Sequence, residues 1–80
     1  MKEILHVKEM RITDCGFFGS ARKIHYKMGN DNYYFYSYKG NPLQNFVVDA
    51  EGNDITKSEL GSQIMISGMN FIFQIYKNEN

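Results

Sequence analysis

The stretch RKIHYKMGNDNYYFYSY, residues 22–38, decides the fold class that the sequence predicts. Two runs of strand-forming residues, 22–28 and 33–38, are separated by the tetrapeptide GNDN at residues 29–32. Gly, Asn and Asp tolerate the backbone conformations that tight loops need. Two such runs around a loop of this kind are typical of a β-hairpin. We therefore predict two antiparallel strands joined by a four-residue loop.

The alternation of side chains along this hairpin gives it two different faces. In the predicted register Met28 lies opposite Tyr33, and the pairs continue to Lys23 opposite Tyr38. One face is expected to pack on the core; it carries Ile24, Tyr26, Met28, Tyr33 and Phe35. The other face mixes cations with aromatic rings: Lys23, His25, Lys27, Tyr34, Tyr36 and Tyr38. A slip of one residue in the register would change these assignments.

Two further segments predict strands on either side of the hairpin. Within residues 3–13, apolar and polar residues alternate, but Leu5 and Val7 lie in one phase and Met10 and Ile12 in the other. One strand with a bulge near Lys8 and Glu9 would bring both pairs to the same face. A helix is the alternative there, because Glu, Leu, Lys and Met are good helix formers. Residues 45–49, centred on FVV, predict a short strand.

The last third of the chain predicts one helical turn followed by a long strand. Residues 56–59, TKSE, match a capping box, and Gly61 would end the single turn that it starts. Apolar residues alternate with others along residues 63–77: Ile64 and Ile66 share one phase, and Met69, Phe73 and Ile75 share the other. The phase changes at Gly68, which predicts one bent strand with a bulge there. A hairpin with its turn at Gly68 is the alternative reading.

Together these segments predict a single small β-rich domain over residues 1–80. The class is all-β or β-rich α+β: a small antiparallel sheet or partly open barrel of about five strands, with one short helical turn before the last strand. Small SH3-like and OB-like barrels have this size.

Composition and charge narrow the class of function and the compartment. Nine basic and nine acidic residues give zero net charge, which counts against nucleic acid as a ligand because its binders normally carry a basic excess. One cysteine rules out a disulfide framework and fits a reducing compartment. The N-terminus lacks the apolar run of a signal peptide, and no apolar run is long enough to cross a membrane. We therefore expect a cytoplasmic protein.

No residue pattern in the sequence supports catalysis, a metal site or a cofactor. The one nucleophile set is Cys15 with Asp14 and either His6 or His25, and nothing nearby would lower the pKa of the thiol. The acidic run that begins at Asp49 lacks the Gly and Glu of a calcium loop, so it predicts an acidic turn. We therefore expect a protein without enzymatic activity that needs no metal or cofactor.

The mixed hairpin face is the candidate binding surface, together with Phe17 and Phe18, which we expect to form the apolar tip of a glycine-flanked loop over residues 14–19. Aromatic residues interleaved with cations occur at protein interfaces and on single-stranded nucleic acid binders; a sheet face partly covered by another segment would have the same pattern. We predict a small protein-binding regulator or inhibitor, a kind common among phage and mobile-element proteins of this size. The alternative is a small barrel that binds single-stranded nucleic acid. The same face, or an edge strand, could also form a homodimer.

Overall fold

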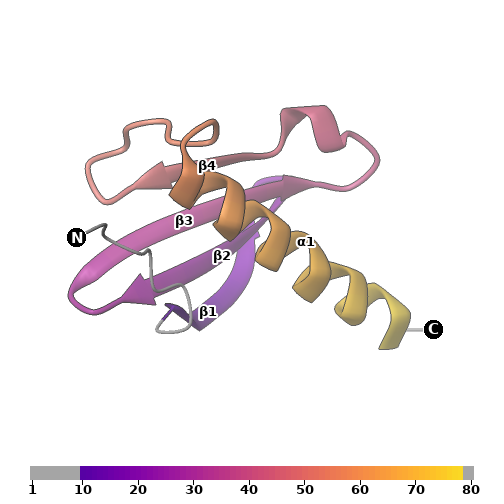
Figure 1. Ribbon diagram of the computed structural model, residues 1–80. Coiled ribbons are helices and arrows are strands. Elements are labelled where there is room, and N and C mark those ends of the chain that lie inside the picture. The colour runs from indigo at the N-terminus through magenta and orange to yellow at the C-terminus, as the bar shows by residue number, and fades with distance from the viewer. Residues whose placement is uncertain (1–9, 79–80) are drawn as a thin grey trace.

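A computed structural model describes residues 10–78, which form an open sheet with one helix across it (Figure 1). The elements, in chain order, are β1 (Met10–Phe18), β2 (Ala21–Met28), β3 (Asp31–Tyr38), the 3-10 turn η2 (Pro42–Gln44), β4 (Phe46–Asp49) and α1 (Glu59–Asn78). The sheet is antiparallel with the order β1-β2-β3-β4. The predicted β-rich α+β class with a small antiparallel sheet is confirmed. The expected count of about five strands is wrong for residues 10–78, where four strands form an open sheet.

The predicted hairpin is present as β2 and β3, but its register differs from the prediction. Its connection is the two-residue turn Gly29-Asn30, so Met28 pairs with Asp31 and Lys23 pairs with Tyr36. Gly29 has φ 62°, and a glycine in the first central position is typical of a tight two-residue hairpin turn. The error is a shift of two residues along β3. A shift of two keeps every side chain on its own face, and the predicted division into two faces is therefore confirmed.

β1 occupies residues that the sequence assigned to a loop. Cys15 and Gly16 pair with Ile24 and Lys23 of β2, so the glycine there lies within a strand. The register shifts between Ile12 and Asp14, which marks a bulge. The expected bulge at Lys8 and Glu9, and most of the strand or helix expected over residues 3–13, lie outside the described residues.

α1 overturns the prediction of a single helical turn followed by a bent strand over residues 63–77. Its buried positions are Gly61, Ile64, Gly68 and Ile72, which recur at the three- and four-residue spacing of one helix face. Ile66 and Phe73 supported the strand reading, but they are 61% and 62% exposed on the other side of the helix. Within residues 10–78, no helix combines the length and the hydropathy that a membrane span needs.

The start of α1 also differs from the predicted capping box. Ser58 is the N-cap: its Oγ accepts a hydrogen bond from the backbone N–H of Gly61 at 2.9 Å. Thr56 lies before the helix, where its Oγ1 accepts a hydrogen bond from the Val47 backbone N–H at 2.9 Å. Gly61 does not end the helix. Its backbone packs so closely on the Ile55 carbonyl that a Cβ atom would collide with the oxygen.

The core lies between α1 and the face of the sheet that it covers. It consists of Ile24, Tyr26, Phe35, Val47, Ile64 and Ile72. The hydroxyl of Tyr26 donates a hydrogen bond to Ser67 Oγ of α1 at 3.0 Å, so its buried polar group is satisfied. Gly68 lies directly against the ring of Phe35, which lets the helix approach the sheet closely. The predicted core face of the hairpin is therefore correct.

Candidate functional site

The candidate site is the sheet face opposite α1, which we call the open face. Strand pairing places all six predicted hairpin residues on it and adds one ring from β1 and two side chains from β4. Its rings, lysines and apolar side chains are Phe18, Lys23, His25, Lys27, Tyr34, Tyr36, Tyr38, Phe46 and Val48, and the same pairing adds Arg11, Asp14 and Asn32. Among residues 10–78, no helix or strand packs over this face, because α1 crosses the other side (Figure 1).

Aromatic rings on the open face pack against one another across three strands. The rings of Tyr36 and Phe46 are stacked, with centroids 4.8 Å apart and planes 13° apart. Tyr38 stacks more loosely on Phe46 at 6.4 Å, and Phe18 meets Tyr36 edge to face at 5.6 Å. Aromatic pairs of these geometries each contribute about 0.5–1.5 kcal/mol beyond the area that they bury. The rings therefore form an ordered cluster even though no helix or strand of residues 10–78 covers them.

Lys23 lies at the centre of this cluster. Its Nζ is 4.9 Å from the ring centroid of Tyr34, 5.8 Å from that of Tyr36 and 5.9 Å from that of Phe18. A cation held over rings in this way gains about 0.5–1 kcal/mol at a partly exposed site. The ammonium group is thus positioned among the three rings.

His25 has a positioning role on the open face. Its ring stacks on Tyr34 with centroids 4.9 Å apart, and both of its nitrogens are engaged. Nε2 lies 2.8 Å from Asn32 Oδ1, and Nδ1 lies 2.8 Å from Thr13 Oγ1. Because an amide oxygen only accepts, Nε2 donates the hydrogen bond to Asn32. His25 therefore fixes the position of the Tyr34 ring.

The other predicted binding residues lie at the two ends of the face. Lys27 pairs with Arg11 and Asn32, away from the rings. Phe17 and Phe18 are 70% and 63% exposed beside the β1–β2 turn, but they lie on opposite faces of the sheet. Phe18 belongs to the open face. The ring of Phe17 lies instead under the guanidinium of Arg22, 4.6 Å from its centroid, on the side of α1.

The structure divides the one catalytic set that the sequence offered. Cys15 pairs with Ile24 and packs against the core, whereas Asp14 and His25 pair with each other on the open face. His25 therefore cannot reach the thiol, and His6 lies outside the described residues. Within residues 10–78, no three His, Cys, Asp or Glu side chains lie close enough to hold a metal ion.

The expected acidic turn is present, and its first carboxylate is occupied by the turn itself. Asp49 Oδ1 accepts hydrogen bonds from the backbone N–H groups of Glu51 and Asn53, at 3.0 and 2.8 Å. These bonds to the charged form, first of all the one from Asn53, hold the pKa of Asp49 below its ordinary value. The carboxylate thus serves to shape the turn.

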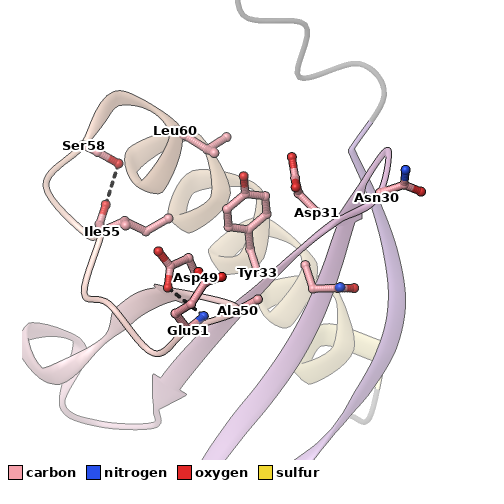
Figure 2. Close-up of a pocket in the computed structure, with 10 residues that line it drawn as sticks. Asn30, Asp31, Tyr33, Asp49, Ala50, Glu51, Ile55, Ser58 and Leu60 are labelled. Carbon is pink, nitrogen blue, oxygen red and sulfur yellow. Dashed lines mark hydrogen bonds between the residues drawn. The ribbon is translucent and has the colours of Figure 1, made fainter.

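A hollow that sequence reasoning missed lies at the end of the sheet near the start of α1 (Figure 2). It measures 440 Å³, and Tyr33 stands in it with Asp31, Asp49 and Glu51 around it. Partial burial raises the pKa of the Tyr33 hydroxyl, and the three carboxylates raise it further. The sequence signal for this hollow was the excess of five acidic over two basic residues in residues 41–80, but only folding brings Asp31 beside Asp49 and Glu51. The hollow is therefore acidic, with three carboxylates in its lining.

Comparisons with protein-family models, with curated proteins and with solved structures found no match. The case for a function therefore rests on the chemistry of the open face.

Proposed function

We propose that this chain is a non-catalytic protein-binding domain that regulates or inhibits another protein by docking its open face on it. The observation that carries the proposal is the aromatic cluster around Lys23 on the face that α1 leaves uncovered. Rings held rigidly beside a cation give a partner a large contact area and lose little entropy on binding.

The orientation of the rings favours a protein partner over single-stranded nucleic acid. A four-stranded sheet with exposed rings is also a platform on which bases stack, and this feature supports the alternative function. Stacking, however, needs a free ring face. Here Tyr36 already stacks on Phe46 and Tyr34 on His25, so those ring faces are engaged within the molecule. Together with zero net charge, this favours a protein surface.

The polar groups on the open face favour a partner that offers hydrogen bonds. The hydroxyl of Tyr26, on the core side, is paired with Ser67. By contrast, within residues 10–78 the hydroxyls of Tyr34, Tyr36 and Tyr38 have no hydrogen-bond partner. In the free protein water satisfies these groups, and in a complex a partner's backbone or side chains would replace it.

Three tyrosines on the open face provide the direct test. We expect the triple variant Tyr34→Ser, Tyr36→Ser, Tyr38→Ser to lose a protein that the wild type captures from a lysate of its source cell or of a host. The matched control changes two exposed apolar residues on the far side of α1, Ile66→Ser and Phe73→Ser, and keeps the partner. With the purified partner we expect the Kd to rise at least 100-fold for the triple variant, because central aromatic residues each contribute about 2 kcal/mol or more.

Folding and nuclease controls make the result decisive. Circular dichroism must show that the triple variant is folded. If the triple variant is unfolded, Lys23→Glu, which keeps every aromatic ring, takes its place in the binding test. Capture that survives in both variants refutes the proposal. Capture that disappears after nuclease treatment, with affinity that falls steeply as salt rises, assigns the open face to single-stranded nucleic acid instead.

A further inference from the structure

The side of α1 that faces away from the sheet carries a continuous stripe, which we call the outer stripe. It runs from Glu59 through Ile66 and Phe73 to Lys77, with the polar side chains of Ser62 and Asn70 between them and Met69 at its edge. Relative to Glu59, Ile66 and Phe73 come about two and four turns later and Lys77 about five turns later, at 3.6 residues per turn. The buried positions Ile64 and Gly68 lie on the opposite side of the helix. The stripe is therefore directed away from the core.

The outer stripe lacks the charged residues that normally keep a helix face in water. Between Glu59 and Lys77 the sequence of α1 contains no charged residue at all. Ile66, Met69 and Phe73 are exposed along its middle. The exposed polar residues around them, Ser62, Gln63, Asn70 and Gln74, are all uncharged. A solvated helix face normally carries charged side chains opposite its apolar side. An exposed apolar seam on a small protein therefore indicates a surface that another molecule covers.

The two charges at the ends of the stripe indicate which molecule covers it. Glu59 is in the first turn of α1 and Lys77 is in the last turn. When two copies of the helix pack antiparallel about a two-fold axis, Glu59 of each copy comes beside Lys77 of the other. Ile66 and Phe73 of the two copies then alternate across the centre. A parallel pair would instead bring like charges together at both ends. We propose that α1 docks antiparallel on α1 of a second copy of this chain.

A hollow beside the stripe would receive side chains from the second copy. It measures 200 Å³ and lies between α1 and the segment that follows β3, with Tyr38, Pro42, Met69 and Phe73 in its lining. The amide of Asn45 donates a hydrogen bond to Met69 Sδ at 3.0 Å and so holds that side chain at the edge of the hollow. The dimer leaves both open faces uncovered, on opposite outer sides. Its existence is therefore independent of the function proposed for that face.

Charge reversal at the ends of the stripe tests the antiparallel arrangement. Sedimentation velocity at low salt should show a wild-type dimer with a dissociation constant in the micromolar range, as expected for a seam one helix wide. Glu59→Lys and Lys77→Glu should each raise that constant about 3- to 10-fold, because each turns two attractive pairs into repulsive ones. The double variant should restore wild-type affinity. An equimolar mixture of the two single variants should form a heterodimer more tightly than either variant pairs with itself.

Three controls separate this seam from other interfaces. Lys57 lies just before α1. Lys57→Glu makes the same change of charge as Lys77→Glu and should leave the dimer intact. Phe73→Lys should give a monomer, whereas Leu43→Lys, at an exposed apolar residue outside the stripe, should not. A wild type that stays monomeric up to about 1 mM overturns the proposal. Single charge variants that dimerise as tightly as the wild type overturn it as well. So does a Phe73→Lys protein that still forms a dimer when the triple tyrosine variant does not, because the interface then lies on the open face.

Discussion

Gly68→Ala tests most directly how α1 lies on the sheet. The Cα of Gly68 faces the ring of Phe35, which is fully buried at the centre of the core. A Cβ added at Gly68 would lie 2.7 Å from Cε2 of that ring and closer still to Cδ2. Carbon atoms in contact are normally about 3.5–4.0 Å apart. The methyl group therefore fits only if the ring or the helix moves.

Two opposing effects set the size of the change in stability. In an isolated helix, replacing Gly by Ala gains about 1 kcal/mol. Overpacking a tight core costs about 1–3 kcal/mol, and here the obstacle is a rigid ring enclosed by other core residues. Because the ring cannot move aside, we take the cost from the upper part of that range, about 2–3 kcal/mol, so that the free energy of unfolding falls by about 1–2 kcal/mol after the propensity gain. In a domain of this size that lowers Tm by roughly 5–15 °C.

Urea and thermal denaturation followed by circular dichroism measure this effect. Asn70→Ala, at an exposed position two residues further along α1, is the matched control and should not destabilise the protein. Phe35→Leu makes room at the contact, so the loss caused by Gly68→Ala should be smaller in that background than in the wild type. A Gly68→Ala protein as stable as the wild type, or more stable, would show that α1 does not pack on Phe35.

Three further changes test other parts of the fold. Ser58→Ala removes the N-cap of α1 and should lower the free energy of unfolding in urea by about 1 kcal/mol, whereas Ser62→Ala should not. Gly61→Ala should be more damaging than Gly68→Ala, because its Cβ meets the backbone oxygen of Ile55; a large loss of helical circular dichroism at 25 °C is the expected result. The pKa of Asp49 is lowered in the folded state, so its stabilising effect is present above the ordinary value of 3.8 and is lost as pH falls through the lower folded pKa. Stability measured from pH 6 to pH 2 should therefore fall less steeply in Asp49→Asn than in the wild type.

The faces of the hairpin were predictable because they depend only on the alternation of side chains. Ile24 and Phe35 are buried as expected, and Lys23 and Tyr36 share the other face. The register was less accessible, because GNDN can turn with two residues or with four, and both choices give the same faces. Only the folded sheet shows which rings meet. The stack of Tyr36 on Phe46 joins two segments whose relative register no local pattern encodes.

The sequence therefore predicted which residues lie on the candidate site but not which of their side chains contact one another. Nothing local in the sequence indicates that His25 is held by Thr13 and Asn32, because β1 was read as ending at Thr13 and Asn32 was placed in a loop. The separation of Cys15 from His25 likewise depends on the bulge between Ile12 and Asp14, which sets which residues of β1 face the helix. Contacts of this kind arise from strand pairing, and a single sequence shows them only after the pairing is known.

The failure to predict α1 has a physical cause that bears on the second-copy proposal. A helix is recognised when apolar residues recur on one side and charged residues on the other. In α1 the buried positions Ile64 and Ile72 follow that rule, but Ile66 and Phe73 lie on the outer side, where charged residues would normally be. The helical period is hidden because apolar residues also lie on the outer side, among the exposed Ser62, Gln63, Asn70 and Gln74. The sheet buries the apolar residues of the inner side and leaves those of the outer side exposed. The residues that made the segment look like a strand are thus the same residues that call for a second copy of α1.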